Sequence, residues 1–527
     1  MVNCKAFTCF ILALTLTVPG CGFYEIKPRT IEPEQLSSQP DAHIHTPTKA
    51  HLKDGSVVIF SEGFKVVGEQ LIGKGEKYDL SREKRAMVEE VPLRDVGALE
   101  VYEKQLDTAT STAVSVPTTV LGVIGGIALF KAVFGSCPTV YSLEGEPQLE
   151  AELFSHSISR RFEAEDLDLL SEVGLRDGGY HLRVANEAPE THYINRLTLE
   201  TVDHPVGTRA FPSPDDKILI VEDGGPFVAR SRLGEDLTAV LTAHDGVPYR
   251  SNPALLKDLA DAMTEDWIDL TVPVPPERQG QTMVVTMRLR NTLMATVLLY
   301  DVMLKSQGIH ALEWLGEETQ SPFYAWRIYR WFGRNYGLHV QSWNGERFVP
   351  VASLSPTGPI AWHEVAVALP PANGPEARIR LSSLPDNWMV EWVGVGYDAL
   401  GSSKVRAIAA EAVDDLPVSD AERILAPLRA NDKKYFTTSP GESHTLFFPA
   451  EPPDPGTVRT CFLRSGGFYI EWLREDWFKD AATVTEGPAF EPGDEAIQKT
   501  AKLWIQKKPN MEKLFLETKI PLAGGKR

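Results

Sequence analysis

Alternation of apolar and polar residues recurs along most of this 527-residue chain and limits the folds open to it. Residues 180–184, 196–202, 282–289 and 361–369 all follow this pattern. Period two places every second side chain on the same face of a strand, so each run predicts a strand with one buried face. We therefore predict a mainly β protein, in which a small N-terminal antiparallel β unit precedes two or more β-sandwich-like domains with few helices.

Few segments have a helical pattern. Residues 255–263 and 405–412 are predicted helices, and the second opens a helical interlude that reaches about residue 428. Residues 494–508 begin with an N-cap at Asp494 and stop before Pro509. This helix either docks on its own protein, which is the commoner arrangement, or lies on an anionic membrane surface. Its apolar face consists of Ile497, Ala501, Trp504 and Ile505.

Changes in composition predict the domain organisation. Four prolines among polar residues make residues 21–49 a predicted flexible tether, and the proline-rich residues 272–276 divide two sandwich domains. The predicted segments are a signal peptide (1–20), the tether (21–49), a small β domain (50–110), a hydrophobic segment (111–136), a β-rich domain (137–271), a jelly-roll-like β-sandwich (272–400), a helical linker (401–435), a closing β-hairpin region (436–480) and a C-terminal tail with the amphipathic helix (481–527).

The start of the chain has the layout of a secretory signal peptide. Residues 1–5 carry a positive charge, and the apolar residues 6–18 lead into Val18-Pro19-Gly20-Cys21. These last four residues resemble the lipobox of bacterial membrane lipoproteins. The resemblance implies a lipid on Cys21, including fatty acids such as palmitate, and a location in the cell envelope. The alternatives are an ordinary cleaved signal with an incidental cysteine and an uncleaved anchor.

Lipidation of Cys21 makes a membrane the first expected partner. Two or three acyl chains anchor a protein stably, because each buried methylene contributes ~0.8 kcal/mol. Gly22 follows the cysteine in place of the aspartate that retains many enterobacterial lipoproteins in the inner membrane. The resemblance therefore implies the outer membrane, with the protein facing the periplasm or the exterior.

Residues 113–135 form an apolar segment whose only charged residue is Lys131. Gly122 and Gly126 give it one GxxxG motif, so one interpretation is a transmembrane helix. The twenty residues that follow contain four glutamates and neither lysine nor arginine, which opposes a span under the positive-inside rule. The other interpretations are a segment that dips into the membrane or packs in an oligomer, and a buried core segment.

Charge and cysteine content narrow the functions further. A formal net charge of −19 excludes a generally basic surface, so no nucleic-acid partner is predicted. Removal of the signal leaves Cys137 and Cys461 besides Cys21. In an oxidising periplasm, these two cysteines form either one disulfide or two buried free thiols.

No motif in the sequence assembles a reaction centre. HExxH, CxxC, GxSxG and a Walker-type phosphate loop are absent, so no catalytic residue is assigned. His43 and His45 form an HxH pair, but a firm metal site needs three or four ligands. We therefore predict no metal and no other cofactor. His363 lies in an alternating strand and is interpreted as a half-exposed structural histidine.

Residues 323–332 have the strongest binding potential, because they mix aromatic rings with arginines. Ser321-Pro322 is a suitable start for a helix here, and Gly337 is a suitable end. Such rings either stack on sugars and partner proteins or fill the sandwich core while the arginines reach solvent. The candidate ligand-binding aromatics are Trp326, Tyr329 and Trp331 in this segment, with Trp343 in a hairpin predicted at residues 340–348.

A second, looser resemblance lies downstream. Residues 378–381, followed by Trp388 and Trp392, resemble the late strands of galactose-binding-like jelly rolls. The resemblance covers about a quarter of the chain, and it implies a sandwich fold without assigning any binding residue. The functional hypothesis is a non-catalytic, lipid-anchored envelope protein that binds a protein or a glycan or serves a structural role. The alternatives are an envelope polysaccharide hydrolase with an acidic pair and a subunit of a membrane assembly.

Overall fold

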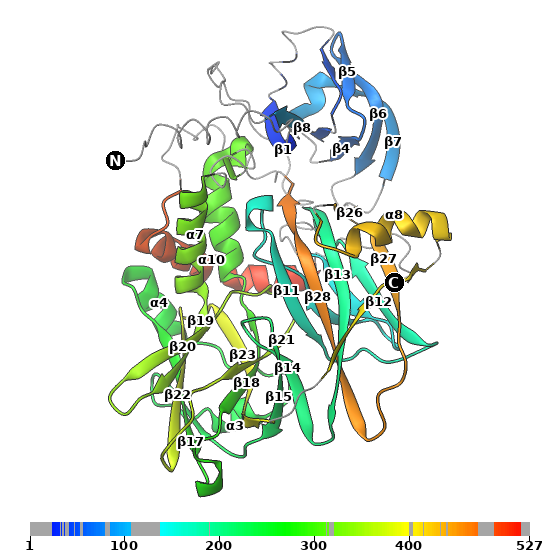
Figure 1. The fold of residues 1–527 in the computed structure, drawn as a ribbon. Helices are drawn as coiled ribbons and strands as arrows, with labels where there is room; N and C mark the ends of the chain where they lie inside the picture. Colours follow the sequence, from blue (N-terminus) through cyan, green and yellow to red (C-terminus); the bar gives the residue numbers. More distant parts are fainter. Residues whose placement is uncertain are drawn as a thin grey trace, which may run out of the picture.

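The computed structural model describes residues 24–31, 33, 36, 42–46, 48–52, 56–78, 85–106, 137–188, 190–311, 314–315, 321–399, 404–414, 416–432, 434–438, 441–472 and 490–517. Antiparallel sheets make up most of this part, so the predicted mainly β class is confirmed. A small β unit lies at one end, above two larger β bodies that lie side by side, with helices flanking them (Figure 1). The signal peptide, Cys21 and residues 113–135 lie outside the described residues.

The N-terminal unit is one sheet with the strand order β1-β8-β3-β4-β6-β5-β2, and β7 pairs with β6. Its core includes Ala50, Val58, Phe60, Val66 and Leu99, which are all buried. Its elements are β1 (Tyr24–Ile31), β2 (His43–Ile44), β3 (Thr48–Leu52), β4 (Val57–Phe60), β5 (Phe64–Val67), β6 (Gln70–Tyr78), β7 (Arg85–Pro92), the short 3-10 helix η1 (Leu93–Asp95) and β8 (Val96–Leu106).

This sheet corrects the prediction that residues 21–49 form a flexible tether. β1 and β2 lie entirely within that range, and β3 begins at Thr48. Pro28 misled the prediction, although a proline is tolerated on an edge strand, where its missing N–H costs no ladder bond. β1 is such an edge strand, since it pairs only with β8 and places Pro28 opposite Tyr102.

The first sandwich packs a sheet of order β10-β9-β12-β27-β25 on a sheet of order β11-β28-β13-β24, with β26 also paired to β13. Leu182, Leu199, Phe448 and Leu463 are among the side chains buried between the sheets. The strands are β9 (Thr139–Ser142), β10 (Gln148–Glu152), β11 (Ala164–Leu170), β12 (Gly179–Ala185), β13 (Glu190–Pro205), β24 (Val405–Ala409), β25 (Ala412–Val413), β26 (Phe436–Thr438), β27 (Ser443–Pro449) and β28 (Thr457–Glu471).

The second sandwich packs the order β14-β15-β23-β18-β21 on the order β16-β17-β22-β19-β20. Leu270, Val285, Val340 and Ile379 are among the residues of its core. The strands are β14 (Thr208–Pro212), β15 (Ile218–Asp223), β16 (Val228–Ser231), β17 (Asp266–Pro273), β18 (Met283–Asn291), β19 (Leu338–Trp343), β20 (Phe348–Leu354), β21 (His363–Ala368), β22 (Glu376–Ser383) and β23 (Trp388–Asp398). β19 and β20 form the hairpin predicted at residues 340–348.

The second sandwich is inserted into the first, between β13 and β24. The domain boundary predicted at residues 271–272 therefore falls inside a domain, because Val272 and Pro273 end β17, which pairs with both β16 and β22. The helix predicted at 405–412 is also wrong. β24 pairs there with residues 198–202 of β13, and sheet pairing outweighs the helix propensity of an alanine-rich segment.

Helices form a third body beside the sandwiches, with Leu259, Val297, Ile328 and Ile497 in its core. Its elements are α4 (Pro253–Asp261), α5 (Met294–Val297), the π-helical turn η5 (Leu298–Leu304), α7 (Pro322–Tyr336) and α10 (Asp494–Glu517). The remaining helices are η3 (Arg160–Phe162), α3 (Thr238–Thr242), η4 (Pro276–Arg278), η6 (Lys305–His310) and α8 (Val418–Leu428). α4 confirms the helix predicted at 255–263.

Helix α10 docks on its own protein, as the commoner of the two interpretations expected. Ile497, Ala501 and Trp504 are fully buried in the helical core. The helix continues past Pro509, where the sequence predicted its end, because Met511 is buried and Glu512 pairs with Arg250 at 2.5 Å. In the part of the chain that the structure describes, no helix is both long and apolar enough to cross a membrane.

Candidate functional site

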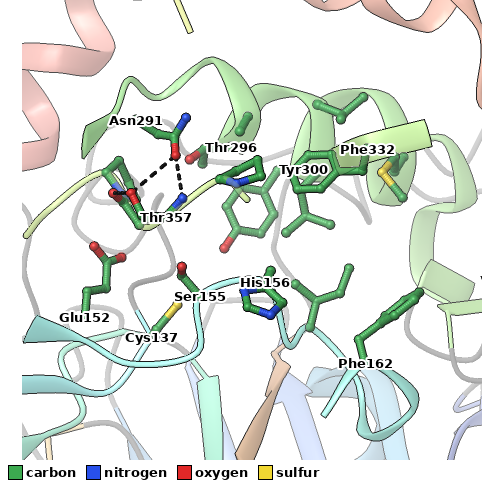
Figure 2. Close-up of a pocket in the computed structure, with 18 of the residues that line it drawn as sticks. Cys137, Glu152, Ser155, His156, Phe162, Asn291, Thr296, Tyr300, Phe332 and Thr357 are labelled. Carbon is green, nitrogen blue, oxygen red and sulfur yellow. Dashed lines mark hydrogen bonds between the residues drawn. The ribbon is translucent and has the colours of Figure 1, made fainter. Parts of the chain in front are cut away.

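A cavity of about 120 Å³ lies where the first sandwich meets the helices. One side is the segment after β10, which carries Ser155 and His156 (Figure 2). The other side is formed by α5, η5 and α7, and the loop at residues 356–359 closes one end. Three stretches of sequence therefore meet here, from the first sandwich, the second sandwich and the helices.

The wall of the cavity is mainly apolar. Phe162, Leu299 and Met303 line it, together with Ile328 and Phe332 from the inner face of α7. Ser321 caps α7, since its side chain accepts a hydrogen bond from Tyr324 N, and Gly337 is the C-terminal cap, as the sequence predicted. The helix is thus held at both ends, with its buried side facing the cavity.

Glu152 lies at the end of the cavity that the loop at residues 356–359 closes. The residue is 1% exposed, and its Oε2 accepts hydrogen bonds from the backbone N–H groups of Ile360 at 2.9 Å and Ala361 at 3.3 Å. A Cβ on Gly358 would lie 1.8 Å from Cδ of Glu152, so only glycine leaves room for this carboxylate.

Hydrogen bonds hold the closing loop and the neighbouring tyrosines. Asn291 Oδ1 accepts from Thr357 N at 2.6 Å (Figure 2). The hydroxyl of Tyr300 donates to Glu471, and the hydroxyl of Tyr469 donates to the carbonyl oxygen of Ser155 at 3.0 Å. These bonds fix the polar part of the wall before any ligand arrives.

Cys137 lines the cavity and is not bonded to Cys461. Both cysteines are free, buried thiols of the first sandwich core, so the structure takes the second of the two predicted alternatives. Burial raises the pKa of Cys137 well above its ordinary value, and the nearby Glu152 and Glu190 raise it further. Burial also raises the pKa of Cys461 to about 11. A thiol that stays protonated is a poor nucleophile.

A second polar group lies between the two sandwiches. Burial and the nearby Asp168 raise the pKa of Asp166 to about 7, while burial lowers the pKa of His156. His363 Nδ1 pairs with Asp168 Oδ1 at 3.2 Å. Burial acts to lower the pKa of His363, but the two aspartates outweigh it, and the net shift is upward. His363 is therefore a partly exposed ion-pair residue of the interface, with a side chain that is 13% exposed, where the sequence predicted a half-exposed structural histidine.

The carboxylates near the cavity bear on the hydrolase alternative. Glu152 is the one carboxylate among the described lining residues. Asp166 accepts hydrogen bonds from the backbone of Phe154 and Leu167, and Asp168 pairs with His363. Glycoside hydrolysis needs two carboxylates that flank one bond. The described lining does not supply such a pair.

The structure separates the four predicted aromatics. Trp326 and Tyr329 are each 53% exposed on the outer side of α7, where Phe323 is 69% exposed. Trp331 lies on the inner side and lines the cavity. Trp343 belongs to the β19–β20 hairpin, where it packs edge-on against Phe348. The core-packing alternative thus holds for Trp331 but not for Trp326.

We name the exposed set of Phe323, Trp326, Tyr329 and Arg330 the α7 aromatic face. The rings of Phe323 and Trp326 are 6.3 Å apart, and the Arg330 guanidinium lies 5.1 Å from the centre of the Trp326 ring. This contact is a cation–π interaction, which keeps the ring and the charge together at the surface. The residues recur at helical spacing, so they share one side of α7.

The rings of His43, on β2, and His45, just after it, have centres 3.7 Å apart and planes tilted by 44°. Among the described residues, no group of three or more histidine, cysteine, aspartate or glutamate side chains is placed to hold a metal ion. Glu152, His156 and Asp166 were not predicted as site residues from the sequence. Asp166 and Asp168 do occupy alternate positions of β11 between leucines, which was a visible signal, but their burial against another domain was not.

Comparisons with known proteins do not assign a family. No known protein family matches the chain, and no curated protein matches it. The solved structures that resemble it include an exo-β-1,3-galactanase from Phanerochaete chrysosporium with galactose, at 8% identity and a TM-score of 0.15, over 71% of this chain and 82% of the galactanase. They also include a GH31 α-xylosidase from Xanthomonas citri, at 8% identity and a TM-score of 0.14, over 85% of this chain and 37% of the xylosidase. Scores this low carry no argument about function.

Proposed function

We propose that this chain is a lipid-anchored protein of the bacterial cell envelope that binds a partner protein through the α7 aromatic face. The observation that carries the proposal is the exposure of three neighbouring aromatic side chains on one well-capped helix. Isolated exposed apolar residues are normal, but a contiguous aromatic group marks an interaction surface.

The composition of the face favours a protein over a glycan. Tryptophan, tyrosine and arginine are the residues that most often dominate the binding energy of protein interfaces. Arg330 and Arg334 are exposed on the same helix, and they form a local positive area on a chain of net charge −19. A partner with an acidic rim around an apolar pocket would match the aromatic side chains and the positive area of this face. The lipid on Cys21 would keep the face close to partners in the same membrane.

The anchor is tested by replacing Cys21 with serine. Labelled palmitate is expected to mark the wild-type protein and not the Cys21→Ser variant, because serine cannot form the thioether. The variant is then expected to leave the membrane fraction. Label on the variant would contradict the lipobox interpretation. If the unlabelled variant stays in the membrane fraction during carbonate extraction, another segment anchors the protein in the membrane. Residues 113–135 are the first segment to test.

The binding face is tested by the triple substitution Phe323→Ala, Trp326→Ala and Tyr329→Ala. Each hot-spot residue contributes about 2 kcal/mol or more, so affinity for the partner is expected to fall at least ~100-fold. Stability is expected to stay within about 0.5 kcal/mol per residue, because the three side chains are largely exposed. A photo-crosslinker at position 326 identifies the partner in intact envelopes, and titration then measures the loss.

The matched control is Val418→Ala, which removes an apolar side chain that is 87% exposed on a different helix, α8. It is expected to leave partner binding unchanged. Partner affinity that survives the triple substitution would overturn the assignment of the face. Binding of the wild-type protein to a glycan array, with loss in the triple variant, would replace the protein partner by a glycan.

A further inference from the structure

The cavity behind α7 is separate from the proposed partner surface. Its residues come from the inner side of the helix, whereas the α7 aromatic face lies on the outer side. Tyr329 belongs to both, since it lines the cavity and is also 53% exposed. The cavity therefore reaches the surface beside Tyr329, which gives a ligand a way in.

One wall of the cavity has an unusual backbone. The π-helical turn η5 supplies Leu298, Leu299, Tyr300 and Met303 to the lining. π-helical turns are rare, and they frequently lie at functional sites. Empty space inside a protein also lowers its stability in proportion to the volume. A molecule that fills this cavity would therefore stabilise the folded chain.

Size limits what the cavity holds. A volume of about 120 Å³ is close to the ~150 Å³ of an engineered apolar protein cavity that binds benzene. Phe162, Ile328 and Phe332 offer the apolar contacts that a ring of this size needs. A lipid or an oligosaccharide is too large to enter, so the occupant is a small molecule with one ring.

Two polar side chains of the wall already have hydrogen-bond partners within the protein. The hydroxyl of Tyr300 donates to Glu471. The Asn291 side chain accepts from Thr357 N at 2.6 Å and donates to the carbonyl oxygen of Asn387 at 3.0 Å (Figure 2). A ligand gains little from these groups, so apolar contact supplies most of its binding.

The wall offers no positive charge to an anionic ligand. No lysine or arginine belongs to the described lining. His156 is the one histidine there, and burial lowers the pKa of its imidazole, so the ring is neutral at pH 7. An anion would lose its hydration without gaining a charged partner, which is costly inside a protein.

The wall does not favour a cationic ligand either. Glu152, the one carboxylate of the described lining, accepts hydrogen bonds from the backbone N–H groups of Ile360 and Ala361. Arg290 and His363 also interact with Glu152. A cation would have to compete with these groups and would lose its own hydration. A neutral ligand avoids both costs.

We propose that this cavity binds a neutral molecule with a single aromatic ring, which packs against Phe162, Tyr300 and Phe332 (Figure 2). Aromatic rings prefer such partners, because offset and edge-to-face contacts add to the apolar area that they bury. The site is separate from the α7 aromatic face, and it does not depend on lipidation of Cys21. The ligand class is defined by this chemistry: one ring of about the size of benzene without a charged group.

The test uses the full-length chain with Cys21→Ser and three probes that share a benzene ring. Ethylbenzene is expected to bind with a Kd on the order of 100 μM, which ligands of this size can reach. Benzylammonium has nearly the same shape with a positive end, and phenylacetate has a negative end, so both are expected to bind at least ~10-fold more weakly. Isothermal titration calorimetry at pH 7 gives the three affinities. Ethylbenzene is also expected to raise the temperature of thermal unfolding, because it binds the folded state.

Two variants of the lining locate the probe. Ala295→Leu occupies part of the cavity and is expected to abolish ethylbenzene binding. Phe332→Leu enlarges the cavity. It is therefore expected to change the ratio of the affinities for tert-butylbenzene and ethylbenzene by at least ~10-fold in favour of the larger probe. This ratio does not depend on how stable the variant is, so it decides the location even if Ala295→Leu fails to fold.

Trp326→Ala, on the outer side of α7, is the control. It is expected to leave ethylbenzene binding unchanged, which separates this site from the proposed partner surface. Benzylammonium or phenylacetate that binds as tightly as ethylbenzene would overturn the proposal, as would no binding of any probe. An unchanged ethylbenzene affinity in folded Ala295→Leu, or an unchanged affinity ratio in Phe332→Leu, would place the probe elsewhere and overturn it as well.

Discussion

Replacing Trp504 by alanine is expected to lower the free energy of unfolding by about 3 to 5 kcal/mol, the usual range for a buried tryptophan or phenylalanine. The indole is fully buried among the helices, and its Nε1 donates a hydrogen bond to Asp386 Oδ2 at 2.8 Å. The substitution leaves a cavity and removes a donor from a carboxylate that is 1% exposed. Urea denaturation followed by circular dichroism measures the loss.

The consequence extends beyond one side chain because Asp386 is itself constrained. Its backbone has φ 58°, a left-handed conformation that is uncommon for residues other than glycine. Lys508 Nζ also donates to Asp386 Oδ2, at 2.6 Å, so two residues of α10 hold this turn. Loss of Trp504 is therefore expected to loosen both α10 and the β22–β23 connection. Amide hydrogen exchange should rise in both segments together.

Another tryptophan in the same chain provides the control. Trp326→Ala makes the same chemical change at a side chain that is 53% exposed, and its effect is expected to stay within about 0.5 kcal/mol. Trp504→Phe keeps most of the packing but loses the N–H donor, so it should fall between the two. An effect of Trp504→Ala as small as that of Trp326→Ala would mean that α10 is not docked through this ring.

The strands and several helix ends were predictable because their causes are local. Alternation at residues 282–289 and 361–369 is a property of each strand alone, and both runs are strands in the structure. Ser321 and Gly337 also act locally, and they cap α7 as predicted. Trp504 was predicted on a buried helix face for the same reason, since its position follows from helical spacing.

The topology was not predictable because its causes are distant in sequence. β28 pairs with β13 along its whole length, although more than two hundred residues lie between them. No periodicity at either strand identifies the partner. The same limit explains the error at 405–412, where pairing with β13 decides the structure. It also explains the boundary placed at 272–276, where prolines at a strand end look like an interdomain linker.

The cavity could not be predicted for the same reason, because the residues that form it are far apart in the sequence. Of the predicted site residues, Tyr329, Trp331 and Cys137 line it, the first two predicted as ligand-binding aromatics and the third as a possible disulfide residue. Glu152 and Gly358 meet across two domains, and nothing in the local sequence of either points to the other. Aromatic and cysteine content flagged some of the wall residues, but only the fold shows that they face one carboxylate.

The second substitution with a large expected effect on stability lies in the N-terminal unit. The outward side of its sheet bears Lys49, His51 and Glu100, which alternation in a strand would leave in water. They are buried instead, at 5%, 2% and 0% exposure. Lys49 lies directly opposite Glu100 in the β3–β8 pairing, with Nζ 3.5 Å from Oε1, and Nζ is 4.7 Å from the centre of the Trp472 ring. Trp472 follows β28, so this charged cluster lies between the N-terminal unit and the first sandwich.

Glu100→Ala is expected to destabilise the protein by about 3 to 5 kcal/mol, because it removes a carboxylate that pairs with a buried ammonium group. Burial lowers the pKa of Lys49 below its ordinary value of 10.5, and Glu100 acts in the opposite direction. Without Glu100, the pKa of Lys49 in the folded state falls further. The unfolded state then binds more protons, so stability rises with pH. The deficit of Glu100→Ala should accordingly shrink as the pH rises toward 10.5.

A double substitution separates charge from shape at this interface. Replacing a buried ion pair with apolar residues of similar volume is often neutral or stabilising, whereas removal of one partner is costly. Lys49→Met with Glu100→Leu is therefore expected to recover most of the stability that Glu100→Ala loses, and to remove the part of the pH dependence that comes from Lys49. Urea denaturation at pH 7 and pH 9.5 measures both effects. If the double variant is as unstable as Glu100→Ala and equally dependent on pH, loss of the Glu100 charge beside Lys49 is not the cause, and the close packing around Trp472 must carry the interface.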